Sequence, residues 1–271
     1  HIRNFGHYSL IILFVVFEVL KLSQERASRS SVLACYALAV AVWTFLFIAG
    51  GRGPFFVFFV TLTVLFVVNR GYLTKNYITV LFTSMLLGLL ISLPLSFDSF
   101  GVHSIYERTV SANSLNTLSS SRIGIWSEVL QHSLSSPFFG EGPEGYLFTV
   151  SQASYPTTIQ PHGLLAQIVM EWGWVGAILF LLVLADVIAP VFYKCRQQHE
   201  KNFVQIGSFG TLVAILVFSL IDGVLYHPRS TLLFCVVLAL LLSELSDKDN
   251  CVVQKISRPL LIAAASPLLL L

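Results

Sequence analysis

The most constraining feature of this sequence is a series of long apolar runs that carry no charge. One of them, Val32–Ala49, has eighteen consecutive residues without Asp, Glu, Lys or Arg. Runs of about 18 or more apolar residues are typical of helices that span a lipid bilayer. Hydrophobic residues make up 55% of the 271 residues and charged residues only 11%, whereas about a quarter are charged in a typical soluble domain. The sequence therefore predicts an all-α integral membrane protein.

We expect about seven membrane-spanning helices, arranged as a polytopic bundle in a single domain that covers residues 1–271. The predicted spans are Phe5–Leu20, Val32–Ala49, Phe55–Asn69, Asn76–Leu95, His162–Tyr193, Phe203–Ile221 and Ser230–Leu245. The chain begins with His1 rather than Met and stops inside an apolar run. We therefore interpret it as a fragment of a longer protein that lacks N-terminal spans.

One long polar segment, residues 97–161, separates the fourth and fifth predicted spans. Loops on the cytoplasmic side of a membrane are enriched in Lys and Arg. The loops after the first, third, fifth and seventh spans hold 11 basic residues, and the opposite side holds 5. The polar segment is therefore predicted to face outward, as one large periplasmic or extracellular loop that contains short helices.

All basic residues on the predicted outer side are arginines: Arg3, Arg52, Arg108, Arg122 and Arg229. The guanidinium group presents a planar fork of donors that suits a phosphate group. Arg52 lies in a Gly-Gly-Arg-Gly-Pro turn, whose glycines let the backbone approach a ligand closely. An interfacial arginine in a tight turn is the alternative interpretation.

Arg122 follows three serines and opens an amphipathic helix, which suits either the membrane surface or packing against the bundle. Its predicted apolar face consists of Ile123, Trp126, Leu130 and Leu134. A serine N-cap would satisfy a free backbone amide. An arginine in the first turn opposes the helix dipole, and an anion bound at this N-terminus would compensate for that. An arginine that anchors at the lipid headgroups is the alternative.

His162 stands between Pro161 and Gly163, where the outer loop becomes a helix. An unperturbed histidine is mostly a neutral base at pH 7, suited to take a proton. A helix-capping or interfacial histidine is the alternative. His227 and Arg229, in the turn before the last predicted span, are candidates of a lower rank.

Three acidic residues, Glu171, Asp186 and Asp222, lie within or at the edges of apolar helices, where ionisable residues are functional candidates. We expect Glu171 to line the same cavity as His162. The Gly140–Gly145 run has the pattern G-x-G-x-x-G, but a helix precedes it where a dinucleotide site needs a strand. We interpret its glycines as turns. The four cysteines form no zinc-binding pattern, and we predict no metal and no cofactor.

Four motifs occur in a defined order along the chain. They are the Gly51–Pro54 turn, a Ser-Arg-x-x-x-Trp helix start at Ser121–Trp126, a Pro-x-x-Gly-x-Gly element at Pro137–Gly142, and a His-led helix with Glu-x-Gly-x-x-Gly at His162–Gly176. Together they resemble the O-antigen ligase and O-antigen polymerase superfamily of bacterial envelope glycosyltransferases. The chain departs from that pattern at Gly163, where the family often has Asn.

The resemblance implies a GT-C-like helical protein in the bacterial plasma (inner) membrane, with its active site on the periplasmic or exterior side. It implies a glycan donor on undecaprenyl diphosphate, a lipid-linked or glycan acceptor, contact with membrane lipids, and no nucleic acid. It assigns diphosphate binding to Arg52 and Arg122 and proton abstraction to His162. The expected reaction is an inverting, metal-independent transfer to an acceptor hydroxyl.

Other functions share parts of this pattern. An O-antigen or exopolysaccharide polymerase and a protein O-oligosaccharyltransferase would use the same donor and differ in the acceptor. A transporter of lipid-linked sugars would also explain outward-facing arginines, but such proteins usually show internal repeats, and we find none in this sequence. A purely structural membrane protein is the remaining alternative.

Overall fold

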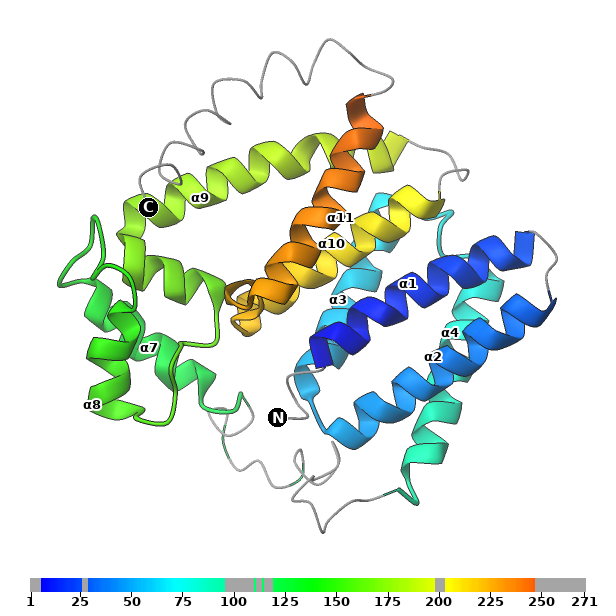
Figure 1. The fold of residues 1–271 in the computed structure, drawn as a ribbon, viewed down its shortest axis with the longest axis horizontal. Coiled ribbons are helices and arrows are strands. Elements are labelled where there is room, and N and C mark those ends of the chain that lie inside the picture. Colours follow the sequence, from blue (N-terminus) through cyan, green and yellow to red (C-terminus); the bar gives the residue numbers. More distant parts are fainter. Residues whose placement is uncertain are drawn as a thin grey trace.

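The computed structural model describes residues 6–25, 29–95, 110, 114, 119–197 and 203–246. Regular secondary structure in these ranges is helical, and none of their residues lies in a strand (Figure 1). The prediction of an all-α fold is confirmed for this part of the chain. Much of the first half of the predicted outer loop, including Arg108, lies outside the described residues, as does Arg3.

Long helices occupy each of the predicted spans. They are α1 (Gly6–Glu25), α2 (Arg29–Ala49), α3 (Arg52–Val68), α4 (Lys75–Ser92), α9 (Leu164–Gln197), α10 (Phe203–Ile221) and α11 (Pro228–Ser246). Among the described residues, α2, α4 and α9 are long and apolar enough to cross a membrane, and α3, α10 and α11 provide shorter apolar helices. The helices therefore agree with a membrane protein, whereas the seven-span topology stays a prediction.

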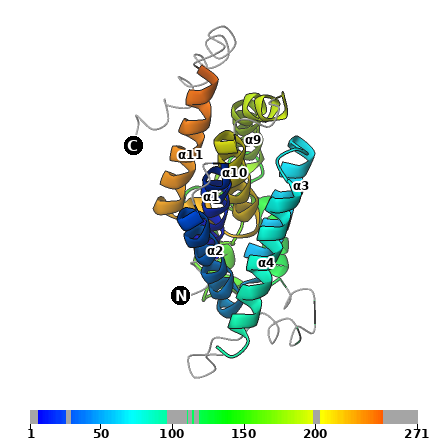
Figure 2. The ribbon, with the colours of Figure 1, turned by 90° about the vertical axis from the view of Figure 1, so that its right-hand side faces the viewer.

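The centre of the bundle is formed by α1 and α10. α1 packs against α2 and α10, and α10 also packs against α3 and α11. In the side view of Figure 2, α11 and the α3–α4 pair lie at opposite edges with α1 and α10 between them. The core is rich in aromatic side chains, and Phe14, Trp43 and Phe58 are fully buried in it. Gly88 brings α4 close to α2, since a Cβ atom there would lie only 2.5 Å from Cβ of Trp43.

A buried polar cluster lies in α1 and the turn that follows α3. The Tyr72 hydroxyl donates a hydrogen bond to the Glu18 carboxyl group, and Nζ of Lys21 donates to the Tyr72 carbonyl oxygen at 2.9 Å. Nζ of Lys21 also lies 4.1 Å from the centroid of the Tyr72 ring. Such mutual contacts lower the cost of burying ionisable groups in an apolar bundle.

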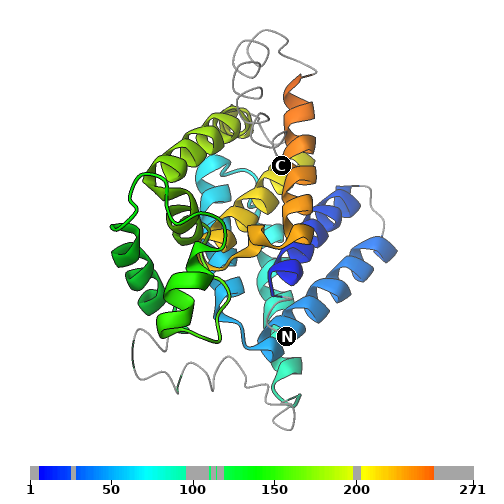
Figure 3. The same ribbon diagram turned by 60° about the vertical axis from the view of Figure 1, so that its left-hand side comes forward.

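The outer segment contains α7 (Arg122–Ser133), a π-helix, η3 (Leu147–Ser151), and a short helix, α8 (Gln152–Ser154). Figure 3 shows this segment, in green, at the end where α9 begins. α7 packs through Ile125 and Val129 against η3 and α9. Most of its predicted apolar face points away from the bundle, because Ile123, Leu130 and Leu134 are 48%, 50% and 71% exposed. The alternative in which these three residues pack on the bundle is therefore wrong. A neighbouring face of α7, with Ile125 and Val129, packs there instead.

α9 is broken at Gly173, which has φ 69° and ψ −173°. The prediction of a continuous helix from His162 to Tyr193 is therefore wrong. The loop between α7 and η3 bonds both sides of the break. The amides of Trp174 and Val175 donate to the carbonyl oxygens of Pro137 and Phe138, at 2.8 and 3.3 Å. Backbone groups freed from a helix inside a membrane protein need such partners.

The Gly140–Gly145 run turns the chain and also forms hydrogen bonds with α9. The amides of Glu141 and Gly142 donate to the carbonyl oxygens of Met170 and Glu171, at 2.8 and 3.0 Å. A Cβ atom at Gly140 would lie 2.6 Å from the Glu171 carbonyl carbon. The loop approaches the broken helix so closely that a side chain at this position has no room.

We expect Gly140→Ala to destabilise the protein more than Gly142→Ala. Both glycines have positive φ, which costs an alanine about 1–2 kcal/mol, but only Gly140 faces backbone atoms, whereas nothing lies within 4 Å of a Cβ at Gly142. Overpacking adds roughly 1–3 kcal/mol. Thermal unfolding of the purified variants in detergent measures the difference. Equal unfolding temperatures for the two variants would contradict the close approach of the loop to α9.

Candidate functional site

Three segments that are distant in the sequence meet at one end of the bundle. They are the first residue of α7, Arg122, the Pro161–Gly163 turn before α9, and Asp222 directly after α10. A Cβ atom at Gly163 would lie 3.3 Å from the carbonyl oxygen of Leu220, so the turn is in direct contact with the last turn of α10.

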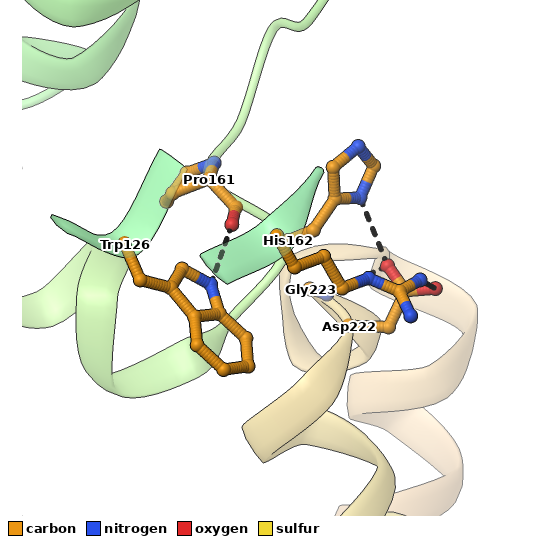
Figure 4. A network of polar contacts seen from close by, with 6 residues as sticks. Trp126, Pro161, His162, Asp222 and Gly223 are labelled. Atoms are coloured by element: carbon orange, nitrogen blue, oxygen red, sulfur yellow. Dashed lines mark hydrogen bonds and ion pairs between the residues drawn. The ribbon is translucent and has the colours of Figure 1, made fainter. Parts of the chain in front are cut away.

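The Asp222 carboxylate joins Arg122 and His162 (Figure 4). Nη2 of Arg122 donates to Oδ2 of Asp222 at 3.0 Å, and Nδ1 of His162 lies 3.0 Å from Oδ1. Oδ1 also accepts the backbone amide of Gly223 at 3.0 Å. The three side chains are 24% to 34% exposed, so they are partly desolvated and still open to a ligand.

The charge of Asp222 determines which nitrogen of His162 carries the proton. Burial on its own would raise the pKa of Asp222. The hydrogen bond with His162, the charges of Arg122 and His162 and the Gly223 amide outweigh it and hold this pKa below its ordinary value. An ionised carboxylate only accepts hydrogen bonds, so Nδ1 of His162 must carry the proton. In the neutral form of the ring Nε2 then carries the lone pair, and this far ring nitrogen points away from Asp222 (Figure 4).

The serines before α7 position Arg122 at the start of that helix. Ser120 and Ser121 have φ 56° and 66°, a left-handed conformation that reverses the chain into the first turn. The N-cap residue, Ser121, makes no side-chain hydrogen bond to the helix, so the predicted capping by an N-cap serine is wrong. The Ser119 hydroxyl, two residues earlier, accepts the amide of Ile123 at 3.4 Å instead. The charge that faces Arg122 in the structure is Asp222, which offsets the unfavourable position of an arginine at a helix N-terminus.

A tryptophan one turn into α7 holds the turn that carries His162. Nε1 of Trp126 donates to the Pro161 carbonyl oxygen at 2.9 Å, as Figure 4 shows. His162 has φ 51°, which is uncommon for a residue with a side chain. A Cβ atom at Gly163 would lie 2.9 Å from Nε1 of Trp126. The glycine that departs from the family pattern therefore makes room for the indole ring.

Arg52 begins α3 beside the same end of α10. A Cβ atom at the next residue, Gly53, would lie 3.4 Å from Cδ1 of Ile221, and Ile221 directly precedes Asp222. The structure thus brings the Arg52 turn to the edge of the Arg122–Asp222–His162 network, with the Arg52 side chain partly buried. Direct participation of Arg52 in the site stays a prediction.

An apolar groove of about 460 Å³ begins beside this network. It lies between α7, α9 and the last turn of α10. Its lining consists of Trp126, Val129, Leu130, Gly163, Leu165, Ala166, Val169, Trp174, Ala177, Ile178, Leu181 and Leu220. One end of the groove is therefore next to His162, and the other follows the exposed apolar surface of α9.

The remaining candidates have other positions. Glu171 accepts hydrogen bonds from the Gln167 side chain and from the Glu144 amide, so its carboxylate ties the outer loop to the broken helix. His227 and Arg229 are exposed, and Asp186 is partly buried in the second half of α9. In the described parts of the chain, no three His, Cys, Asp or Glu side chains gather as metal ligands do.

A comparison with known protein families gives one match. The family described as O-antigen ligase matches residues 27–181, more than half of the chain. The chain belongs to the O-antigen ligase family. No curated protein matches the chain, and no solved structure does. Membership in this family agrees with the resemblance found in the sequence motifs.

The O-antigen ligase family implies a membrane enzyme of the glycosyltransferase type that acts on lipid-linked glycans. The matched region contains Arg52, Arg122 and His162, whereas Asp222 lies beyond its end. Sequence reasoning placed Asp222 among the candidates but gave it no partner. Its only local signal is an acidic residue that directly follows an apolar helix.

We expect Asp222→Asn to lower the stability of the protein at neutral pH and to have a smaller effect in acid. The pKa of Asp222 is lowered from its ordinary value of 3.8 in the folded protein. The ionised carboxylate therefore stabilises the fold above that value, and this contribution is lost as pH falls through the lowered folded pKa. At pH 7 the variant should lose about 1–3 kcal/mol.

Thermal unfolding of both proteins in detergent at pH 7 and pH 3 measures this effect. Glu144→Gln, at an exposed position in the loop after α7, serves as a control for the loss of a carboxylate. If the Asp222 variant is less stable than the unmodified protein by the same amount at both pH values, the ion pairs of Asp222 are not the cause of the lost stability.

Proposed function

We propose that the protein transfers a glycan from undecaprenyl diphosphate to an acceptor hydroxyl at the outer face of the bacterial plasma membrane, as an O-antigen ligase does. The observation that carries the proposal is one carboxylate, Asp222, that holds a guanidinium and an imidazole at 3.0 Å on its two oxygens. A cation for the leaving diphosphate and a base for the acceptor thereby lie side by side.

His162 is proposed as the general base. Asp222 holds the proton on Nδ1, so Nε2 presents its lone pair to the space outside the network. A carboxylate that orients a histidine in this way also stabilises the imidazolium that forms when the base takes a proton. Position and tautomer of His162 therefore both suit proton abstraction from a hydroxyl group.

Arg122 is proposed to bind the diphosphate. A guanidinium has five N–H donors, more than one oxygen of Asp222 can accept, so donors remain for a phosphate oxygen. Pre-placed donors that face a developing negative charge are often worth roughly 3 kcal/mol each in the transition state. Arg52, at the start of α3, is proposed to bind the same diphosphate from the other side.

The apolar groove is proposed to hold the first part of the isoprenoid chain of the donor. Its lining is almost entirely apolar, and it runs from Gly163, next to His162, to Leu181 on the exposed side of α9. A diphosphate at Arg122 would then have its lipid tail in the groove and its sugar in front of His162.

In the proposed reaction the acceptor oxygen attacks the anomeric carbon of the donor sugar, and the acceptor proton moves to Nε2 of His162. The bond between the anomeric carbon and the diphosphate oxygen breaks, and undecaprenyl diphosphate leaves with the electron pair. Attack from the face opposite the leaving group inverts the anomeric configuration. No step requires an oxidant, a reductant or a further co-reactant.

Purified protein incubated with a polyprenyl-diphosphate glycan and candidate acceptors tests the proposal. A new glycosidic bond, detected by mass spectrometry, supports a transferase, and movement of the lipid-linked glycan across vesicles without a new bond contradicts it. A deletion strain distinguishes the acceptor class. Loss of all attached polymer indicates a ligase, and a single attached repeat unit indicates a polymerase.

We expect His162→Ala to lower the transfer rate by roughly 100-fold to 10,000-fold, the usual contribution of a general base. Arg122→Ala should lower it by roughly 100-fold or more. Arg122→Lys keeps the charge but loses the planar fork, so it should also be impaired. The transfer assay on purified variants measures all three rates.

Matched controls come from the same chain. His132→Ala changes an exposed histidine at the end of α7, and Arg196→Ala changes an exposed arginine at the far end of α9. Neither should change the transfer rate. Full activity of both His162→Ala and Arg122→Ala at normal protein levels would refute the proposed mechanism.

We expect Ala166→Trp to weaken donor binding, because the larger side chain would fill part of the groove. The KM for the donor should rise by roughly tenfold while kcat changes little, the pattern for lost binding that is equal in ground and transition states. Ala185→Trp, on the exposed side of the same helix, is the control. An unchanged KM in the Ala166 variant would exclude the groove as the site of the lipid tail.

A further inference from the structure

The outer loop exposes large aromatic side chains next to the break in α9. Phe138 and Phe139 are 67% and 80% exposed, and Trp172, on the adjoining turn of α9, is 51% exposed. We call these three residues the aromatic anchor. Large apolar side chains that gather on one part of a surface mark a contact with a partner or a membrane.

The backbone of the loop fixes the depth of the anchor relative to α9. The carbonyl oxygens of Pro137 and Phe138 accept the amides of Trp174 and Val175. A Cβ at Gly173 would lie 2.4 Å from the Phe138 carbonyl oxygen and 2.6 Å from the Gly140 amide nitrogen. The anchor is therefore at the level of Trp174 and cannot slide along the helix.

The length of α9 places that level at the edge of the bilayer. Basic residues mark its other end, at Lys194 and Arg196. From Trp174 to Lys194 the helix rises by about 30 Å at roughly 1.5 Å per residue, which equals the thickness of the hydrocarbon core, about 30 Å. With Lys194 at one boundary of that core, Trp174 lies at the other.

The surface of α9 below this level is suited to lipid. Ile178, Leu179 and Leu182 are 56%, 57% and 61% exposed. Above it, the loop becomes polar at once, since the exposed Glu141 and Glu144 follow the two phenylalanines. An aromatic band between an apolar helix surface and a charged loop is the arrangement found at membrane–water interfaces.

We infer that the aromatic anchor is embedded in the interfacial zone of the bilayer, among the lipid headgroups and the first carbons of the acyl chains. Leu130 and Leu134 of α7, which are also exposed, extend the same surface. The described part of the outer loop is thereby attached to the membrane beside the break in α9, while the exposed polar residues of α8 stay in water. The inference concerns membrane contact and does not depend on the transfer reaction.

Photo-crosslinking tests this contact directly. Phe139 is replaced by p-benzoylphenylalanine, a conservative change, in the full chain. The protein is irradiated in native membranes, and its intact mass is then measured to detect phospholipid adducts. Ile178, on the exposed surface of α9, is the positive control. Ala153, exposed in α8, is the control in the water-facing part of the loop.

We expect lipid adducts at position 139 to be about as abundant as those at 178. They should be roughly tenfold more abundant than those at 153, because aromatic side chains partition into the membrane interface. The same replacement at Phe138 provides a second position if the first variant is unstable. Adducts at 178 without adducts at 138 and 139 would overturn the inference. Equal amounts of lipid adduct at 139 and 153 would also overturn it, because lipid contact would then not be specific to the aromatic anchor.

Discussion

The carboxylate of Asp222 is the interaction on which the candidate site depends. It joins Arg122 and His162, which are 100 and 60 residues away in the sequence. Neither partner lies in the middle of a helix, since Arg122 begins α7 and His162 lies in the turn before α9, so secondary structure alone does not fix their separation. Opposite charges that are partly withdrawn from water attract each other more strongly than on an open surface. One acidic group therefore defines the geometry of two basic groups.

The break in α9 provides the second constraint. The loop after α7 bonds to both sides of Gly173, and the Trp126 indole bonds to the turn before Leu164. α7, which carries Arg122, is thus attached twice to the segment that carries His162. The buried side chains of Ile125, Val129, Tyr146 and Met170 fill the space between these attachments. The outer segment and the first part of α9 form one packed unit, and Asp222 connects it to the bundle.

The sequence predicted those features that depend on local patterns. Apolar runs gave the long helices, and short motifs drew attention to Arg122 and His162. The break at Gly173 was not predicted, because apolar residues continue on both sides of it. The prediction of which face of α7 could pack on the bundle was wrong, because apolar residues occur on more than one side of that helix. The role of Asp222 could not be predicted, since a pairing over 100 residues leaves no local trace.

The same break in α9 also bears on the proposed position of the site relative to the membrane. A continuous α9 that begins at Leu164 would carry the His162 turn about 15 Å beyond the level of Trp174, at roughly 1.5 Å per residue. The break redirects the first turns of α9 toward α7 and α10, so the His162 turn reaches the end of α10. This position suits the proposed reaction, in which a lipid-borne diphosphate meets a hydroxyl group from the aqueous side. Gly140 and Gly173 lie in close contact at this break, so these two glycines bear on the position of the His162 turn, and hence on the proposed chemistry, as well as on the fold.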